Sequence, residues 1–415
     1  MKRHTRPRGT QDFLPPDSER KRHVETVFRE LVTLYGYREV ETPTFEHIEV
    51  FTRSAGAGSD IVTKEMYNFR DRSERELALR PEGTPGVVRA VLEQGYRLPC
   101  RLFYVGPFFR YGRPQKGRLR EFHQLGVEAL GEASPLVDAE LIAMGQQFYE
   151  RLGITDCAVA INSIGCHRCR PEYRQQLVNF LAEHSPALCA DCQVRSAHNP
   201  LRVLDCKNRS CQAVLARAPK PRQHLCPECN EHFQRVIAAL ESQGRRITIV
   251  DQLVRGLDYY NRTTFEYLSA SLGAQDSLGG GGRYDYLVEE FGGPPTPAVG
   301  FALGLERTML ALPAPTQQEH RAPVFIVWLS EPELAPAQQL ANELRANGIS
   351  CQIDFTNGKV RRQFKSAAAA GARYCVIVGA DELAAGVYSL KDLTLGTQIT
   401  VPAGRLVEHL RTVRS

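Results

Sequence analysis

The chain has 415 residues, a formal net charge of +5 and 24% charged residues. This length allows two or three domains with a substantial buried core, and the mild positive charge permits a polyanionic partner but excludes a protein coated in nucleic acid. The sequence contains no run of about 18 apolar residues that could span a bilayer and no apolar N-terminal stretch typical of a signal peptide, so we expect a cytoplasmic protein that is not bound to a membrane.

Residues 1–165 and 245–311 have the pattern of one α+β domain. Helical periodicity in RKRHVETVFRELVTLYGY is followed by the β-rich runs RLFYVGPFF and QLGVEAL, as expected of helices packed on a sheet. Residues 166–244 are rich in cysteine and helical in pattern, without clear strands. Because β-rich character returns after residue 244, we interpret residues 166–244 as an insertion into the first domain.

The last part of the chain has the pattern of a separate small α/β domain. Residues 312–322 are a polar linker rich in proline and alanine. Within residues 323–415, the runs VFIVWL, SCQIDF and YCVIVG alternate with two helical patterns in the order βαβαβ. The segment NGKVRRQFK, residues 357–365, adds lysine and arginine to this domain.

Residues 77–95, LALRPEGTPGVVRAVLEQG, predict a strand that runs into a helix. Thr84 is a favourable N-cap, Pro85 suits the first helical position and Gly95 suits the far end. Glu82 lies just ahead of this helix, where it could offer a carboxylate to the amine of a ligand. The alternative is that Glu82 only caps the helix, because a helix N-terminus favours anions.

A long basic loop follows. Phe109 ends one apolar strand and Phe122 begins another, so residues 110–121 are expected to join two antiparallel strands. The length and charge of the loop suit an element that closes on phosphates, whereas the alternative is a solvated surface loop. Its basic residues are Arg110, Arg113, Lys116, Arg118 and Arg120.

The strand that returns from this loop carries two polar residues on one face. Because side chains alternate along a strand, Gln124 and Glu128 point the same way, roughly 13 Å apart, with Gly126 between them leaving room. This pattern resembles the floor of a site for a cationic or amine-bearing ligand. An edge strand with ordinary polar positions is the alternative.

Residues 253–263, LVRGLDYYNRT, crowd Arg255, Asp258, Tyr259 and Tyr260 into an otherwise strand-like segment. An arginine beside two tyrosines could bind a phosphate and an aromatic or polar substrate group. A stacked surface pair would give the same pattern.

Glycines mark the segments SLGGGGRYDYL and GFALGLER. Four consecutive glycines let the backbone approach a ligand or another strand closely, although such a run most often marks a turn. Arg307 is expected on a helix whose Gly300, Ala302 and Gly304 permit close packing on a sheet, and its guanidinium could lie over an adenine ring or a terminal phosphate. The sequence has neither a P-loop nor a Rossmann fingerprint, so a nucleotide would bind on a different scaffold.

Eight of the twelve cysteines form four closely spaced pairs inside the insertion. In a reducing compartment this spacing indicates a metal before disulfides, and four pairs match two tetrahedral zinc sites with a structural role. The spacing leaves open how the pairs combine, and reduced, buried cysteines left from a lost site are the alternative. Cys100, Cys157, Cys351 and Cys375 are isolated and are interpreted as packing residues. The paired cysteines are Cys166 and Cys169, Cys189 and Cys192, Cys206 and Cys211, and Cys226 and Cys229.

Together these segments closely resemble the bacterial histidyl-tRNA synthetases, a class II aminoacyl-tRNA synthetase family, over nearly the whole chain. The basic loop with its strands resembles class II motif 2, LRPEGT the amino-acid-binding loop, LVRGLDYYNRT the histidine-specific motif, GFALGLER motif 3 and RGTQDFLP the N-terminal signature. LVRGLDYYNRT and FHQLGVEALG are the most specific of these. Gly112 departs from the family, which often has glutamate there. The resemblance implies an α+β catalytic domain with an antiparallel sheet and a C-terminal anticodon-binding domain.

The resemblance also implies a reaction. The carboxylate of histidine would attack the α-phosphorus of ATP, and histidine would then pass to the 3′ end of tRNA(His). Arg110 and Arg255 would hold the α-phosphate and Arg307 would cover adenine and the terminal phosphate, while Mg²⁺ would bridge the leaving phosphates.

For histidine itself, the resemblance implies that Glu82, Thr84 and Gln124 anchor the amino group. Glu128 and Tyr260 would grip the imidazole, with Tyr259 alongside. The basic loop would close on ATP and on the acceptor end of the tRNA, the latter through Arg113, Gln115 and Arg118. A homodimer is implied as well, and the apolar segment VETPTFEHIEVF around Pro43 is compatible with one.

Two other classes of function compete with this interpretation. Regulatory paralogs of the synthetases bind histidine and control an enzyme of histidine biosynthesis, but they resemble only the catalytic core, whereas this chain continues through residues 323–415 with all four motifs intact. A metal-responsive binding module centred on the cysteines would leave those motifs unexplained. ATP–pyrophosphate exchange with each amino acid separates these possibilities.

Overall fold

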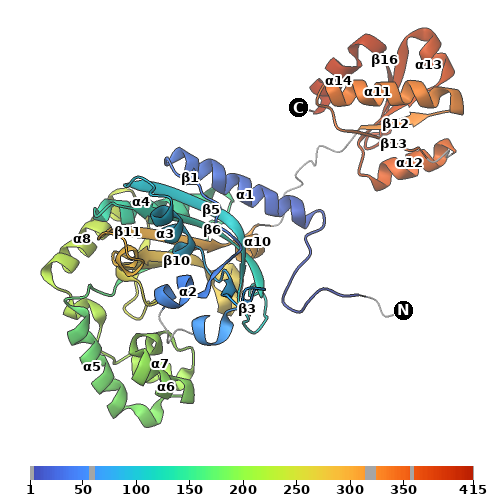
Figure 1. The fold of residues 1–415 in the computed structure, drawn as a ribbon. Coiled ribbons are helices and arrows are strands. Elements are labelled where there is room, and N and C mark those ends of the chain that lie inside the picture. The colour runs from blue at the N-terminus through green and yellow to red at the C-terminus, as the bar shows by residue number, and fades with distance from the viewer. Residues whose placement is uncertain (1–3, 56–60, 314–323, 356–358, 415) are drawn as a thin grey trace. The chain divides into compact units, whose positions relative to one another are not determined.

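A computed structural model describes residues 4–55, 61–313, 324–355 and 359–414. Contacts divide the chain into two compact units, Met1–Pro313 and Ala314–Ser415 (Figure 1). Residues 314–322 of the expected linker and residues 357 and 358 of the basic segment lie outside the described residues.

The first unit is built on an eight-stranded, mainly antiparallel sheet in the order β1-β5-β6-β11-β10-β9-β7-β8. The two outer strands, β1 and β8, pair in parallel with their neighbours. Strand β6 lies between β5 and β11, so the edge-strand alternative for Gln124 and Glu128 is wrong. The strands are β1 Arg38–Glu39, β5 Cys100–Phe109, β6 Glu121–Leu130, β7 Cys157–Ser163, β8 Ile247–Ile249, β9 Asn261–Ser269, β10 Ser277–Arg283 and β11 Ala298–Gly304.

A second, three-stranded sheet in the order β2-β4-β3 leads into helix α3. Helix α3 covers Thr84–Glu93, and Gly95 follows it with a positive φ of 57°, as expected for the residue that ends a helix. The strands of this sheet are β2 Phe45–His47, β3 Asn68–Arg70 and β4 Glu76–Leu79, with α2 at Ile48–Ala55 and a π-helical turn at Ile61–Glu65.

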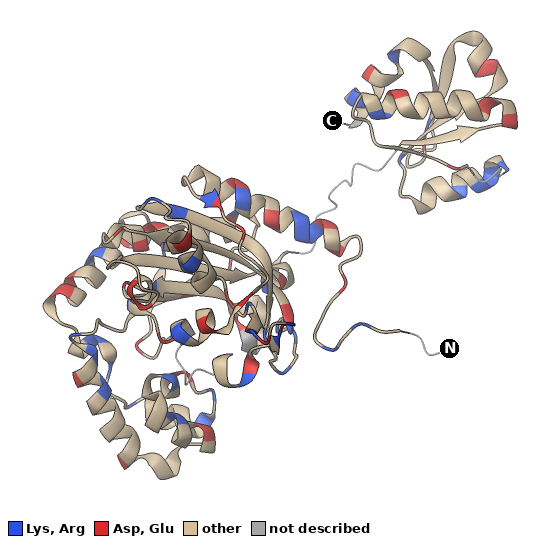
Figure 2. Ribbon diagram, in the orientation of Figure 1, with Lys and Arg blue, Asp and Glu red and all other residues tan. Residues whose placement is uncertain are grey.

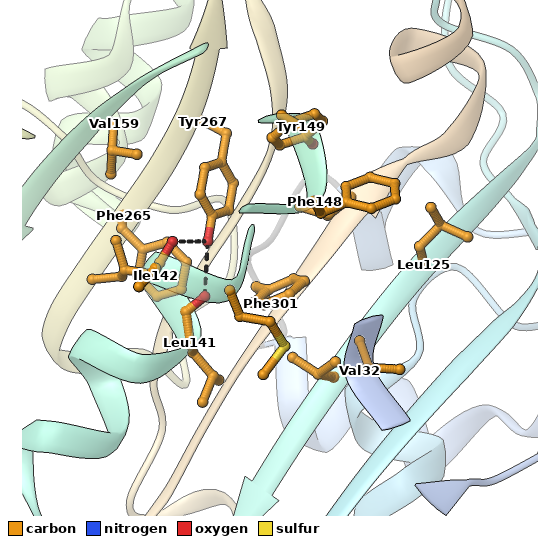
Figure 3. Close-up of a cluster of buried hydrophobic side chains, with 14 of the residues drawn as sticks. Val32, Leu125, Leu141, Ile142, Phe148, Tyr149, Val159, Phe265, Tyr267 and Phe301 are labelled. Carbon is orange, nitrogen blue, oxygen red and sulfur yellow. Dashed lines mark hydrogen bonds between the residues drawn. The ribbon is translucent and has the colours of Figure 1, made fainter. Parts of the chain in front are cut away.

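Apolar helix faces cover the large sheet and form its core (Figure 3). Helix α1, Asp17–Leu34, buries Val24, Phe28, Leu31 and Val32, whose spacing places them on one helical face. Tyr267 reaches from β9 to helix α4, where its hydroxyl donates to the carbonyl oxygens of Leu141 and Ile142 over 3.1 Å each. The other helices of this layer are α4 Pro135–Arg151, α8 Pro227–Ser242 and α10 Leu305–Ala311. Helix α9, Leu287–Glu290, packs in a second cluster with α3.

The cysteine-rich region consists of helices joined by turns and irregular segments, and its described residues contain no strand. Figure 1 shows α5, α6 and α7 grouped together, with α8 returning to the sheet. Helix α8 is fixed on α4 by a buried 2.7 Å contact between His232 Nε2 and Asp138 Oδ2. The elements are α5 Arg170–Glu183, α6 Ala190–His198 and α7 Arg209–Leu215, with 3₁₀ turns at Ser185–Ala187, Pro200–Asp205 and Pro221–His224.

The second unit has a five-stranded sheet in the order β13-β12-β14-β15-β16. Its first three strands are parallel and alternate with α11 and α12, which confirms the predicted βαβαβ order. Figure 2 shows basic residues gathered along α12. The elements are β12 Val324–Trp328, α11 Leu334–Ala346, β13 Cys351–Ile353, α12 Val360–Ala369, β14 Tyr374–Val378, α13 Ala380–Ala385, β15 Val387–Asp392, β16 Gln398–Pro402 and α14 Leu406–Arg414. Among the described helices of the chain, none combines the length and the apolar character needed to cross a bilayer.

The structure corrects two expectations about the glycine-rich segments. The run Gly279 to Gly282 lies inside strand β10 and forms no turn. Gly300, Ala302 and Gly304 lie on strand β11 and not on a helix, because α10 begins only at Leu305. Both strands pair closely with each other, since glycine has no side chain to separate them.

Candidate active site

One face of the large sheet carries a cavity of about 310 Å³. Its walls come from β6, β10 and β11, from the start of α3, from the basic loop and from residues 251–260, which we call the 251–260 loop. The cavity brings together nine of the predicted site residues: Glu82, Thr84, Arg110, Arg118, Gln124, Arg255, Tyr259, Tyr260 and Arg307.

Glu82 is a buried carboxylate with one oxygen to spare. Its Oε2 accepts a 2.9 Å hydrogen bond from the hydroxyl of Tyr259, whereas Oε1 has no partner among the described residues. Burial raises the pKa of Glu82 to about 7, although nearby Arg110 and the Tyr259 hydroxyl act to lower it. An ammonium group in the cavity would supply the missing donor and favour the ionised form.

Glu128 lies behind Thr84 and does not line the cavity. Its two oxygens accept hydrogen bonds from Thr84, over 2.6 Å, and from Tyr284. Burial raises the pKa of Glu128 to about 8. The expected N-cap role of Thr84 is wrong, because the N-cap residue is Gly83 and the Thr84 hydroxyl is committed to Glu128.

The space above Gly126 is filled by Tyr104, a residue that the sequence analysis missed. A Cβ atom built at Gly126 would lie 2.1 Å from Tyr104 Cζ, and one built at Gly83 would lie 2.2 Å from the same atom. From the sequence, Gly126 was expected to leave room for a ligand. In the structure it leaves room for the ring of Tyr104. The sequence offered one indication of this contact, which is that Gly83 and Gly126 both lack a side chain and so leave room for an aromatic ring.

The 251–260 loop is irregular, so the expectation of a strand-like segment is wrong there; β9 begins only at Asn261. Arg255 contacts Glu266 Oε1 at 3.3 Å, and its Nε has no partner among the described residues. The loop lies directly on β10, because a Cβ at Gly280 would meet Arg255 Nη1 at 2.9 Å. Glycine at that position lets the arginine lie over the sheet.

Two more arginines are fixed at the cavity by backbone carbonyls. Arg110 Nε donates to Pro81 O over 2.8 Å, and Arg307 Nη1 donates to Ser277 O over 2.6 Å. Neighbouring Glu306 accepts from His123 N at 3.0 Å and contacts His123 Nδ1 at 2.8 Å, which ties α10 to β6. This positioning contact was not predicted from the sequence.

The basic loop divides its predicted residues between two places. Arg118 lines the cavity and pairs with Glu65 Oε1 at 2.8 Å. Gln115 lines an adjoining cavity, and Arg113 is exposed. At Gly112 an added Cβ would lie 3.3 Å from Arg118 Nε, so a larger residue there would press on that ion pair.

The eight paired cysteines form two separate clusters. Cys166, Cys169, Cys226 and Cys229 make one, and Cys189, Cys192, Cys206 and Cys211 make the other; in each, all four sulfurs lie within 4.8 Å of one another. The first cluster therefore joins the beginning of the insertion to its end. Of the isolated cysteines, Cys100, Cys351 and Cys375 are buried, as expected of packing residues.

The cavity lies on an antiparallel sheet. A basic hairpin loop closes on it, and a later strand and helix supply a further arginine to it. These features define a class II aminoacyl-tRNA synthetase. A family model described as histidyl-tRNA synthetase matches residues 9–308, and one described as anticodon binding domain matches residues 323–412. The chain belongs to the histidyl-tRNA synthetase family.

Individual proteins agree with this assignment. A histidine–tRNA ligase from Desulforudis audaxviator is 48% identical over 413 residues, covering 98% of each chain. The crystal structure of apo histidyl-tRNA synthetase from S. aureus is 35% identical, with a TM-score of 0.82 over 99% of this chain and 100% of that one. A Bacillus halodurans structure titled as an ATP phosphoribosyltransferase regulatory subunit/histidyl-tRNA synthetase is 24% identical, with a TM-score of 0.66 over 90% of this chain and 97% of that one, and shows the fold alone.

Proposed function

We propose that this protein activates L-histidine with ATP to histidyl-adenylate and then transfers histidine to the 3′ end of tRNA(His). The observation that carries the proposal is the composition of the cavity. Glu82 offers an unpartnered oxygen to an amine, and Arg110, Arg255 and Arg307 line the same space for phosphates. This arrangement fits an amino acid whose amine binds Glu82 and whose carboxylate reacts with a phosphate held by the arginines.

The reaction requires positioning and charge neutralisation more than an acid or a base. The carboxylate of histidine attacks the α-phosphorus and pyrophosphate leaves, so negative charge builds up on the phosphate oxygens in the transition state. Arg110 and Arg255 hold the α-phosphate, and Arg307 holds adenine and the terminal phosphate. Mg²⁺ bound to ATP would supply further charge neutralisation at the leaving phosphates.

Histidine is held by other groups that line or adjoin the same cavity. Glu82, Thr84 and Gln124 bind its amino group, and Gln124 Oε1 has no partner among the described residues. Tyr260 binds one imidazole nitrogen, with Tyr259 alongside, and Glu128 binds the other from behind Thr84, outside the residues that line the cavity in the ligand-free structure. Each carboxylate oxygen of Glu128 accepts one hydrogen bond already and has a lone pair left for another donor.

The remaining parts of the proposal concern tRNA, assembly and metal. Arg113, Gln115 and Arg118 face the acceptor end, and residues 323–415 bind the anticodon through the basic helix α12. The protein is proposed to be a cytoplasmic homodimer. The exposed aromatic pair Phe45 and Phe69, whose rings pack 6.3 Å apart, is compatible with an apolar surface that a second copy covers. Structural Zn²⁺ in the insertion has no part in the chemistry.

The rival function, a histidine-binding regulatory paralog, is disfavoured by the presence of a matched anticodon-binding domain. ATP–pyrophosphate exchange measured with each amino acid tests the proposal. We expect histidine alone to support exchange and tRNA(His) alone to be charged. Histidine binding without exchange would favour the regulatory paralog.

A further inference from the structure

Sulfur geometry in the two cysteine clusters matches metal coordination. The distances between Sγ atoms are 3.8 Å for Cys166–Cys169 and Cys166–Cys226, 3.9 Å for Cys169–Cys229 and 3.9 Å for Cys189–Cys206. Four thiolates about 2.3 Å from a tetrahedral Zn²⁺ lie about 3.8 Å from one another, whereas a disulfide would need about 2.05 Å.

Backbone amides also point at these sulfurs. The amide of Cys166 donates to Cys169 Sγ over 3.2 Å, and the amide of Cys189 donates to Cys211 Sγ over 3.2 Å. Such bonds favour thiolates, and outer contacts of this kind orient metal ligands. At Gly165 an added Cβ would lie 2.6 Å from Cys169 Sγ, so glycine is needed beside the first cluster.

The first cluster is joined to the end of the 251–260 loop. Arg170, next to Cys169, donates to the carbonyl oxygen of Tyr260. Gly165, next to Cys166, accepts from the amide of Arg262 over 2.8 Å. The first contact holds Tyr260, the second tyrosine of the loop, and the other holds the beginning of β9.

The second cluster is joined to the same loop at Asp258. Cys189 and Cys206 flank the segment that contains α6 and the 3₁₀ turn Pro200–Asp205. From the junction of these two elements, Asn199 Nδ2 donates to Asp258 Oδ1 over 2.6 Å. Asp258 immediately precedes Tyr259, whose hydroxyl donates to Glu82.

We propose that each cluster binds one Zn²⁺ ion and that the two zinc sites together position the 251–260 loop for histidine. Zinc suits four thiolates at this separation, and it fixes a loop that has no regular structure of its own. The inference rests on the proposed function only for its effect on histidine. Arg170 and Asn199 are positioning residues in this arrangement.

Zinc counting on two matched quadruple variants tests the sites and their pairing. Wild-type protein purified without chelator should hold about two zinc ions per chain by elemental analysis. Replacing Cys166, Cys169, Cys226 and Cys229 by serine should leave about one ion, because it empties a single site. Replacing Cys166, Cys169, Cys189 and Cys192 removes the same number of thiols but should abolish binding at both sites.

Three results would overturn the metal sites. These are fewer than one zinc ion in folded wild-type protein, the reverse outcome for the two quadruple variants, or loss of zinc in the control Cys157→Ser. None of these measurements depends on enzymatic activity, so they stay informative even if histidine does not support exchange.

Positioning is tested with variants that keep every cysteine. Arg170→Ala and Asn199→Ala should retain both zinc ions but raise the KM for histidine in pyrophosphate exchange by on the order of 10-fold, with a smaller change in the KM for ATP. Asn179→Ala, which removes an amide from the exposed face of the same insertion, should change neither value. Unchanged histidine KM in both test variants would overturn the positioning role.

Discussion

Replacing Glu82 by glutamine removes one charge from the cavity and little else. The amide has the same shape as the carboxyl, and it can still accept from Tyr259 at the position where Oε2 accepts over 2.9 Å. What is lost is a charged acceptor at Oε1, which has no partner among the described residues. The change therefore isolates the contact proposed for the amino group of histidine.

The size of the effect follows from the kind of bond removed. A hydrogen bond to a charged group contributes about 1.5–3 kcal/mol, which corresponds to an increase in the KM for histidine of roughly 10- to 150-fold. The KM for ATP should change less, because the phosphates are assigned to Arg110, Arg255 and Arg307 and not to Glu82. Both values come from pyrophosphate exchange.

The pH dependence supplies a second readout. Since the pKa of Glu82 is raised to about 7 by burial, the carboxyl holds a proton below that pH and must release it to bind an ammonium group. The ratio of variant to wild-type KM should therefore grow between about pH 6 and pH 8, where wild-type Glu82 becomes ionised. Taking the ratio cancels the titration of histidine itself. A ratio near one throughout this range would refute the assignment of Glu82.

Three further predictions follow from the same structure. Arg255→Ala should lower single-turnover adenylate formation by on the order of 10²-fold while histidine binding changes less, and an unchanged rate would exclude its proposed role. Deleting residues 323–415 should reduce tRNA charging far more than pyrophosphate exchange, because phosphate contacts to the tRNA are lost; an equal fall with the catalytic fold intact would assign that domain another role. Burial raises the pKa of Glu128 to about 8, so the folded state keeps a proton on Glu128 at pH values where the unfolded chain has released it. As pH rises from about 5 to 8, the ligand-free wild type should therefore lose thermal stability relative to Glu128→Gln. Thermal unfolding temperatures that change in parallel with pH for the two proteins would contradict this.

Local sequence patterns predicted the elements that hold the site. The apolar spacing of α1, the paired strands around the basic loop and the alternation in the second unit are all signals within a few turns or strand lengths. Glu82, Gln124, Arg110 and Arg307 could be placed together because a family resemblance linked their motifs. Their individual motifs left each of them with an alternative role.

The features of the site that the sequence analysis did not predict depend on contacts between segments that are distant in the chain. Tyr104 fills the space between Gly83 and Gly126. The residues next to each glycine in the sequence do not indicate which ring lies above it. The contact of His123 with Glu306 joins residues 183 positions apart. Cysteine spacing likewise allows several combinations of four pairs, and the chain topology selects the one in which the first pair meets the last.

The 251–260 loop shows how such distant contacts make a site from irregular chain. The loop has no ladder of backbone hydrogen bonds of its own, so its conformation depends on what it touches. Below it, Gly280 and Gly282 leave space on β10, where an added Cβ at Gly282 would lie 2.9 Å from Tyr260 Cδ1. Beside it, Arg170 donates to the carbonyl oxygen of Tyr260 and Asn199 donates to the carboxylate of Asp258. A bare strand and a helical insertion thus share the task of holding Arg255, Tyr259 and Tyr260 at one cavity. A larger residue at Gly282 should disturb Tyr260 and the binding of histidine, whereas one at Gly280 should disturb Arg255 and the α-phosphate.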